Sequence, residues 1–213
     1  LNSYVIILTD INAQKSAENE LHLLANYDAL TGLPNRTLFN DRVEHALEQA
    51  KFHECKVALL HINIKRFKYF NDSLGHAVAD ELIKEVAERL KCSLRPSDSV
   101  ARFGGDEFVV LVEDIHQIEQ VLIICTKLMD CVNQNITING QVPKGTGVSI
   151  SPDDAQQGSA LLKAASIALY HAKDSLEGRY QFYKQEMNQH VQRALHLESQ
   201  LTKAYQEEEF CNY

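Results

Sequence analysis

The stretch Gly104-Gly105-Asp106-Glu107-Phe108, with the segments on either side of it, is the most informative part of this 213-residue sequence. Residues 98–103 precede it, and the apolar run Val109–Val112 follows it. A strand, a two-glycine turn and a second strand would place two adjacent carboxylates at a hairpin tip, because paired glycines adopt positive φ without steric cost. The same glycines let a phosphate approach the backbone, and the neighbouring acids can hold the divalent cation that accompanies a nucleotide. Taken alone, these five residues favour a surface hairpin with solvated acids.

The composition describes an ordinary globular protein, since 45% of the residues are hydrophobic and 23% are charged. The formal net charge of -8 argues against a nucleic-acid partner held by a basic face, so none is expected. A nucleotide ligand would need metal ions or a local cluster of Lys and Arg to offset this charge. The five cysteines show no metal-ligand spacing, which favours free thiols and a cytoplasmic location. No stretch approaches the roughly 20 apolar residues of a membrane segment, and neither a membrane segment nor a signal peptide is expected in this sequence.

Hydrophobic periodicity predicts a core with the element order α-β-α-β-β-α-β-β-α-β. Helices are expected over residues 36–51, 74–90, 118–132 and 159–173, and strands over 57–64, 98–103, 109–112, 136–139, 141–150 and 179–183. Residues 65–72 are expected to be a polar stretch, followed by a helix with the apolar stripe Leu74, Val78, Leu82, Val86 and Leu90. The order predicts an α/β (α+β) fold: a mixed, largely antiparallel central sheet flanked by helices.

Both ends of the chain carry elements outside this core. Residues 3–10 have the pattern of a strand without an evident partner, and residues 13–26 have that of a helix. Apolar residues from Met187 to Tyr205 recur at the three- and four-residue steps of an amphipathic helix. The two terminal helices either pack on the core or connect modules and transmit a signal between them.

Several motifs then follow one another in a characteristic order. Asp28–Arg36 has the sequence DALTGLPNR, Arg102–Phe108 carries the glycine turn, and Ala168–Lys173 has the sequence ALYHAK. Between them lie Phe67-Lys68, Asn71-Asp72, Gly75-His76 and Asp80. In these motifs residues 27–184 resemble a GGDEF domain, the diguanylate cyclase family. The resemblance implies a palm-like fold similar to that of nucleotidyl cyclases and polymerases.

The resemblance also implies a reaction. Two GTP-loaded domains would meet face to face as a homodimer, and the 3′-hydroxyl of each GTP would attack the α-phosphate of the other. The products would be cyclic di-GMP and two pyrophosphates. Such a transfer needs in-line positioning and cations that spread the developing charge, so Mg²⁺ or Mn²⁺ is the implied cofactor. GTP and cyclic di-GMP are the implied small-molecule partners.

Roles for single residues follow from the same resemblance. Asp106 becomes a metal ligand with Asn63 and the backbone carbonyl of Ile64, and Glu107 becomes the group that activates the attacking hydroxyl. The implied nucleotide-binding residues are Gly104, Gly105, Phe67, Lys68, Asn71, Asp80 and Lys173. Asn71 and Asp80 suit guanine, because a carboxylate accepts from N1–H and N2–H while an amide meets the remaining edge. The alternatives are a helix N-cap for Asn71 and solvated helix positions for Asp80 and Lys173.

Two departures from the family pattern concern the metal site. The family has Asp-x-Asp before Phe67-Lys68, whereas this chain has Asn63-Ile64-Lys65. An amide oxygen binds Mg²⁺ far more weakly than a carboxylate, and Lys65 adds a positive charge nearby. The cation is therefore expected to bind weakly if at all, and cyclase activity to be impaired. In the alternative interpretation, Lys65 contacts phosphate directly and partly replaces a metal.

Smaller departures point the same way. Ala79 stands where the family has a glycine before Asp80. The segment between Lys173 and Gly178-Arg179 is two residues longer than is usual in the family. Arg179 therefore receives no assigned role in binding the triphosphate.

A second candidate site is Arg95-Pro96-Ser97-Asp98, five residues before the first glycine of the turn. Its position resembles the inhibitory site at which the family binds cyclic di-GMP through Arg95 and Asp98. Arginine suits this role because its planar fork pairs with phosphate or a guanine edge and stacks on bases. The alternative is an ion pair within the loop.

Three functions therefore compete. The chain is a nucleotide-binding domain with impaired cyclase activity that regulates a neighbour, an active diguanylate cyclase, or a dimerising scaffold without a ligand. Residues 1–26 resemble the end of a sensor domain and its linker helix, and residues 185–213 resemble a linker helix leading into a phosphodiesterase domain. Sensor and phosphodiesterase domains are thus the expected neighbours of a GGDEF domain at residues 27–184.

Overall fold

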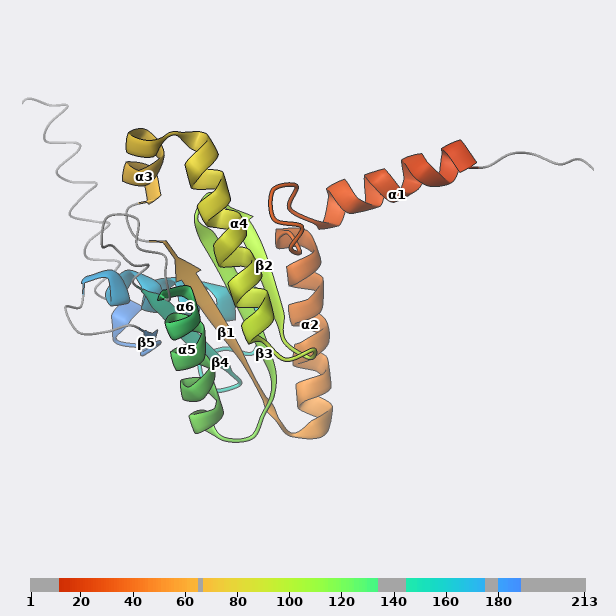
Figure 1. Cartoon of the computed structure of the whole chain (residues 1–213). Helices are drawn as coiled ribbons and strands as arrows, with labels where there is room; N and C mark the ends of the chain where they lie inside the picture. Colours follow the sequence, from red (N-terminus) through yellow and green to blue (C-terminus); the bar gives the residue numbers. More distant parts are fainter. Residues whose placement is uncertain (1–11, 65–66, 134–144, 175–179, 189–213) are drawn as a thin grey trace, which may run out of the picture.

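A computed structural model describes residues 12–64, 67–133, 145–174 and 180–188 (Figure 1). Its centre is a five-stranded sheet with the strand order β2-β3-β1-β4-β5. The strands are β1 (Lys56–Asn63), β2 (Ser99–Gly104), β3 (Glu107–Ile115), β4 (Thr146–Ser151) and β5 (Gln181–Phe182). The helices are α1 (Asn12–Asn26), α2 (Arg36–His53), α3 (Phe67–Leu74), α4 (His76–Ser93), α5 (Ile118–Asn133) and α6 (Gly158–Asp174). The β1–β3, β1–β4 and β2–β3 pairs are antiparallel and β4–β5 is parallel, which confirms the predicted fold class.

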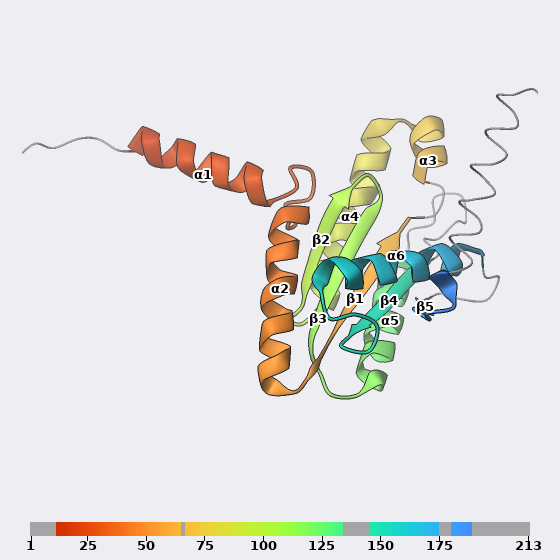
Figure 2. The same cartoon turned by 180° about the vertical axis from the view of Figure 1, so that it is seen from behind.

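Helices cover both faces of the sheet and divide the core into two layers. On one face, α4 and α5 pack against Ala58, Leu60 and Ile62 of β1 and lie in front of the sheet in Figure 1. On the other face, α2 and α6 pack against Val57 and Leu59, as the reverse view in Figure 2 shows. Alternate residues of a strand point to opposite faces, so Val57–Leu60 and Ile62 of β1 are apolar because both faces are buried there, while the polar residues His61 and Asn63 lie toward its C-terminal end.

The close packing of α6 on the sheet depends on Gly147 of β4. A Cβ atom at this position would lie 2.0 Å from the carbonyl oxygen of Ala165 and 2.2 Å from the backbone nitrogen of Leu169. Both contacts are with backbone, which cannot rotate away as a side chain could. Only glycine therefore allows α6 to lie this close to β4.

The helix after β1 differs from the prediction. Residues 67–74, expected to be largely a polar stretch, form α3, and Gly75 at φ 84° separates α3 from α4. Leu74 and Val78 are exposed rather than part of the apolar stripe. The buried face of α4 consists of Ala79, Leu82, Ile83, Val86, Ala87, Leu90 and Ser93. Leu82, Val86 and Leu90 of the predicted stripe are thus buried as expected, and they pack against the sheet and α5.

The remaining predictions for the elements can be compared only in part. The predicted strands over 3–10 and 136–139 and most of the C-terminal helix fall outside the described residues. Helix α1 projects from the body of the domain, with Leu21, Leu23 and Leu24 exposed (Figures 1 and 2). Cys55, Cys92, Cys125 and Cys131 are free thiols, as predicted. Within the described ranges, no helix is both long and apolar enough to span a bilayer.

Candidate functional site

The candidate site lies where the β2–β3 hairpin meets the end of β1. Strand β2 ends at Gly104 and β3 begins at Glu107, with φ values of 122° at Gly104 and 52° at Gly105. Such positive φ values are strained for side-chain-bearing residues, which accounts for the two glycines. In the β1–β3 ladder Glu107 lies opposite Asn63, and the Ile64 backbone N–H donates to the Asp106 carbonyl at 3.3 Å. The fold therefore brings Asn63, Ile64, Asp106 and Glu107 together.

A direct hydrogen bond joins Asn63 to Asp106. The Asn63 amide nitrogen Nδ2 donates to Oδ2 of Asp106 at 2.7 Å. Chemistry fixes this orientation, because an ionised carboxylate only accepts hydrogen bonds and the opposite orientation of the amide would place two oxygens against each other. A hydrogen-bond donor, rather than a metal-binding oxygen, thus faces Asp106 from the end of β1.

Glu107 faces a second side chain of β1. Nε2 of His61 lies 3.9 Å from Oε2 of Glu107, whose side chain is 46% exposed. The other ring nitrogen, Nδ1, lies 3.0 Å from Oγ of Ser166 on α6. Since the single hydroxyl proton of Ser166 goes to the Leu162 carbonyl at 2.8 Å, Nδ1 must be the donor to Ser166. His61 is therefore fixed between α6 and Glu107.

Arg102 anchors the hairpin to the DALTGLPNR segment. Its Nη1 donates to both carboxylate oxygens of Asp28, at 2.9 and 3.2 Å, while Nε and Nη2 donate to the Gly105 carbonyl at 3.1 and 2.8 Å. Thr31 adds backbone and hydroxyl hydrogen bonds to Oδ1 of Asp28, at 3.0 and 2.7 Å. Burial raises the pKa of Asp28. The hydrogen bonds from Thr31 and Arg102, together with the charge of Arg102, lower it by more, so the pKa lies below its ordinary value. Asp28 is thus held ionised and fixes Arg102 under the glycine turn.

The residues expected to contact guanine lie on α3 and α4. Asn71 lies within α3 rather than at a helix N-cap, and its Oδ1 is buried with no hydrogen-bond partner in the described part of the chain. Asp80 is exposed on α4, where nothing distinguishes it from a solvated helix residue. Phe67, the first residue of α3, packs against the core, and Lys68 is exposed. Lys173 lies in α6, but its side chain, like Lys65 and Arg179, is outside the described residues.

Comparison with known proteins identifies the family. The model of the family described as "Diguanylate cyclase, GGDEF domain" matches residues 25–179. This chain belongs to the GGDEF family.

The relatives of this GGDEF domain are parts of longer proteins. The cyclic di-GMP phosphodiesterase NbdA of Pseudomonas aeruginosa is 36% identical over 202 residues, which cover 93% of this chain and 26% of NbdA. The bifunctional diguanylate cyclase/cyclic di-GMP phosphodiesterase MucR of the same organism is 37% identical over 191 residues, covering 88% of this chain and 28% of MucR. The chain thus spans little more than a quarter of each of these relatives.

Among solved structures, the GGDEF domain of TpbB from Pseudomonas aeruginosa matches with a TM-score of 0.72 at 34% identity. The match covers 78% of this chain and 99% of the TpbB structure. The sheet and its helices are therefore those of a GGDEF domain.

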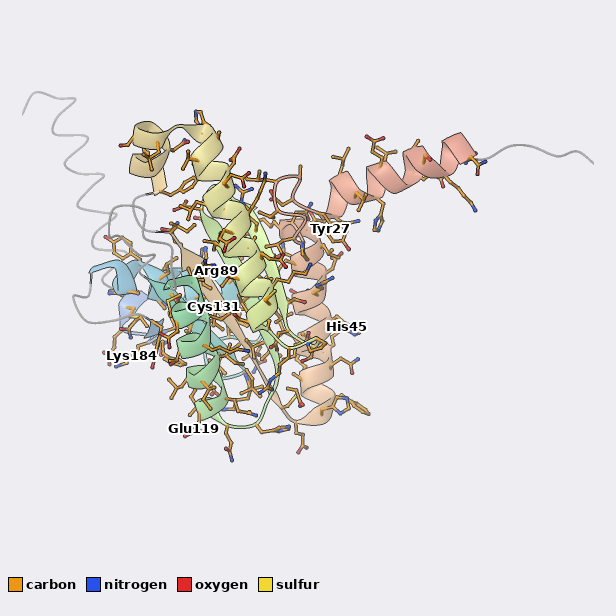
Figure 3. All side chains as sticks on the ribbon, in the orientation of Figure 1. Tyr27, His45, Arg89, Glu119, Cys131 and Lys184 are labelled. Atoms are coloured by element: carbon orange, nitrogen blue, oxygen red, sulfur yellow. The ribbon has the colours of Figure 1, made fainter. Side chains whose placement is uncertain are left out.

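The second candidate site of the GGDEF domain lines a cleft of about 410 Å³. Arg42, Lys91, Arg95 and Asp98 contribute charged groups to it, and Tyr27 lies at the junction of α1 and α2 (Figure 3). The expected alternative, an ion pair between Arg95 and Asp98, does not form among the described residues. Asp98 instead accepts a hydrogen bond from the Arg95 backbone N–H at 3.1 Å and closes the turn. The Arg95 guanidinium therefore remains exposed at the cleft.

Sequence reasoning overlooked His61 and the Asp28–Arg102 pair. The spacing of His61 and Asn63 by two residues on a strand places both on one face, and this signal could have drawn attention to His61. The pairing of Arg102 with Asp28 has no comparable signal, because 74 residues separate them.

Proposed function

We propose that this GGDEF domain binds guanine nucleotides, has impaired diguanylate cyclase activity, and regulates a neighbouring domain in cyclic di-GMP signalling. The observation that carries the proposal is the hydrogen bond from the Asn63 amide to Asp106. It places a donor at the position where the reaction of the family requires an anionic oxygen. Mg²⁺ or Mn²⁺, when bound, supplies the charge that spreads over the transferring phosphate. With one fewer carboxylate, Asp106 and Glu107 are left to hold that cation weakly.

Loss of cation binding slows the chemical step more than it weakens recognition of the base. A metal ion contributes several kcal/mol to phosphoryl-type transfer by stabilising charge in the transition state, and each 1.36 kcal/mol is tenfold in rate. We therefore expect turnover at least about 100-fold below that of a domain with both acids. Glu107, which faces solvent at the hairpin tip, remains available to accept the proton of an attacking 3′-hydroxyl. Because Glu107 is retained, we expect residual cyclase activity rather than none.

Recognition of guanine is assigned to Asn71 and Asp80. A buried carbonyl oxygen without a partner costs about 1–3 kcal/mol, so the orphan Oδ1 of Asn71 favours a ligand that brings a donor. The N1–H and N2–H groups of guanine are such donors, and Asp80 can accept another of them. Phe67 and Lys68 on α3, Lys173 on α6 and the turn glycines Gly104 and Gly105 complete the proposed nucleotide-binding set.

The product, cyclic di-GMP, is assigned to the cleft beside Arg95 and Asp98. Three cationic side chains, Arg42, Lys91 and Arg95, line it around a single carboxylate, which suits a ligand with two phosphates. The guanidinium of Arg95 is exposed and has no ion-pair partner in the described part of the domain, so it can pair with phosphate or stack on a base. Arg95→Ala is expected to abolish cyclic di-GMP binding, and unchanged affinity would refute this assignment.

The regulatory role rests on the kind of protein in which the relatives occur. NbdA is named a phosphodiesterase and MucR a bifunctional cyclase and phosphodiesterase, and this chain matches only part of each. We assign residues 1–26 to a sensor-domain end and linker helix, 27–184 to the GGDEF domain, and 185–213 to a linker helix leading into a phosphodiesterase domain. In this arrangement nucleotide binding, rather than synthesis of product, is the output of the GGDEF domain. A homodimer is required only for residual catalysis.

Two measurements test the proposal. Incubation of the chain with GTP and Mg²⁺ or Mn²⁺, followed by chromatography, is expected to yield only traces of cyclic di-GMP. Robust turnover would establish the active cyclase instead. Calorimetry with GTP and with cyclic di-GMP is expected to show binding of both, whereas a scaffold would bind neither.

A further inference from the structure

Side chains of β1 place nitrogen atoms near Asp106 and Glu107, the two acids of the hairpin, where a cation site needs oxygen atoms. His61 and Asn63 are two residues apart on one face of the strand. Nδ2 of Asn63 is 2.7 Å from Oδ2 of Asp106, and Nε2 of His61 is 3.9 Å from Oε2 of Glu107. Each acid of the signature is thus approached by a nitrogen from β1.

These residues fit a divalent cation poorly. Mg²⁺ prefers carboxylate, carbonyl and water oxygens in near-ideal octahedral geometry, and protein sites commonly supply one or two carboxylates. Here Asp106 already accepts a hydrogen bond from Asn63, and that amide has turned its nitrogen, not its oxygen, toward the acid. Among the described residues, no group of three or more His, Cys, Asp or Glu side chains is arranged to hold a metal ion.

We propose that the nucleotide site of this domain takes guanine nucleotides without a divalent cation, with the Asn63 amide holding Asp106 in place of a metal ion. This inference rests on the nucleotide binding proposed above and specifies its chemistry. The amide nitrogen carries two hydrogens, and Asp106 takes one of them. The second is a donor for a phosphate oxygen, so the same side chain satisfies the protein acid and meets the ligand.

Cation independence has a consequence for the hairpin itself. Two carboxylates at the Asn63 and Asp106 positions would repel each other unless a cation lay between them. The amide removes this repulsion, so the hairpin tip needs no metal to keep its shape. Asn63→Asp reinstates the repulsion and with it the need for a cation.

The test compares three forms of the chain: wild type, Asn63→Asp, and Asn40→Asp. The last is a matched control that adds the same charge at an exposed position of α2. Calorimetry measures GTP affinity in excess EDTA and in millimolar MgCl₂. We expect a change below about threefold for wild type and Asn40→Asp, and at least about tenfold tighter binding in MgCl₂ for Asn63→Asp. Wild-type affinity that is tenfold or more tighter in MgCl₂ would overturn the inference.

A second arm uses the metal alone, without nucleotide. Melting temperature is measured with and without MnCl₂, since a cation that binds only the folded state raises it. We expect MnCl₂ to raise the melting temperature of Asn63→Asp and to leave wild type and Asn40→Asp unchanged. An equal rise in wild type overturns the cation-free site. If GTP binds under neither condition, the proposed function fails, while this arm still decides the question of the cation. If Asn63→Asp does not fold in EDTA but folds with MnCl₂, the inference is supported.

Discussion

Arg102 offers the sharpest test of how the hairpin is held. Its guanidinium makes four hydrogen bonds, two to the Asp28 carboxylate and two to the Gly105 carbonyl, and its side chain is only 10% exposed. Arg102→Met removes all four and leaves Asp28 with the Thr31 bonds alone. Breaking a fully buried pair costs about 3–5 kcal/mol. Because the Asp28 side chain is 20% exposed, we expect a loss near the lower limit, about 3 kcal/mol.

The comparison with Arg102→Lys separates the charge from the geometry. Lysine keeps the positive charge beside Asp28 but cannot bond Asp28 and the Gly105 carbonyl together, because it lacks the planar fork. We expect a loss of about 1–2 kcal/mol for Lys. At about 2–4 °C per kcal/mol, Arg102→Met should lower the melting temperature by about 6–12 °C and Arg102→Lys by about 2–8 °C. The measurement is thermal unfolding followed by circular dichroism.

The exposed Lys84–Glu81 pair on α4 provides the matched control for removing a cation. Lys84→Met should leave the melting temperature unchanged, since surface pairs of this kind contribute little. The Arg102 variants should also lose GTP affinity in the order of their instability, because the Gly105 carbonyl that shapes the turn is released. If Arg102→Met melts within about 2 °C of wild type, the pair does not hold the hairpin and the argument fails.

Three further substitutions test other parts of the structure. The pKa of Asp28 is lowered in the folded state, so its contribution to stability is complete above the unfolded pKa of about 3.9 and is lost as pH falls through the folded pKa. Asp28→Asn should therefore reduce the loss of unfolding free energy between about pH 5 and pH 2, measured by urea unfolding. Gly147→Ala should cost more than about 3 kcal/mol, seen as a lowered urea midpoint or insoluble protein, because its Cβ would meet the α6 backbone at 2.0 Å. Asn71→Leu should maintain or raise the melting temperature, because it removes the buried Oδ1 atom that has no hydrogen-bond partner among the described residues. The same substitution should weaken GTP binding in calorimetry by at least about tenfold. A lowered melting temperature with unchanged affinity would assign Asn71 to structure instead.

The sequence predicted the elements whose burial is simple. Most of strand β1 is apolar on both faces, and the Gly104-Gly105 pair marks the hairpin. Strands β1 and β2 lie within one residue of their predicted limits, whereas β3 begins two residues earlier and ends three residues later than the predicted run. Helix α3 was missed because it has only eight residues, and Gly75 ends it before a helical period is established. The exposure of Val78 was missed for a different reason. Periodicity correctly predicted the buried stripe of Leu82, Val86 and Leu90, but it does not show where along a helix the packing stops, and Val78 lies in the first turn of α4.

The candidate site was predictable as a set of residues but not as a set of contacts. Asn63, Asp106 and Glu107 could be placed together through the resemblance to the GGDEF family, which combines the end of the first core strand with the glycine-turn signature. The Arg102–Asp28 pair could not, since its members are distant in sequence and lie on different elements. The orientation of the Asn63 amide was likewise unpredictable, because the identity of a residue does not determine whether its amide nitrogen or its amide oxygen faces Asp106.

That orientation changes what the substitution means. Replacing a carboxylate by an amide predicts only that a charge is lost and that a cation binds more weakly. The hydrogen bond from Nδ2 to Asp106 adds that the remaining acid is already stabilised without a cation. In the proposed cation-free site, the change that weakens cation binding therefore also removes the structural need for the cation, because no second carboxylate is left to repel Asp106. In the proposed function, a hairpin that keeps its shape without metal recognises a ligand although the chemical step is slow, and such recognition is what control of a neighbouring domain requires.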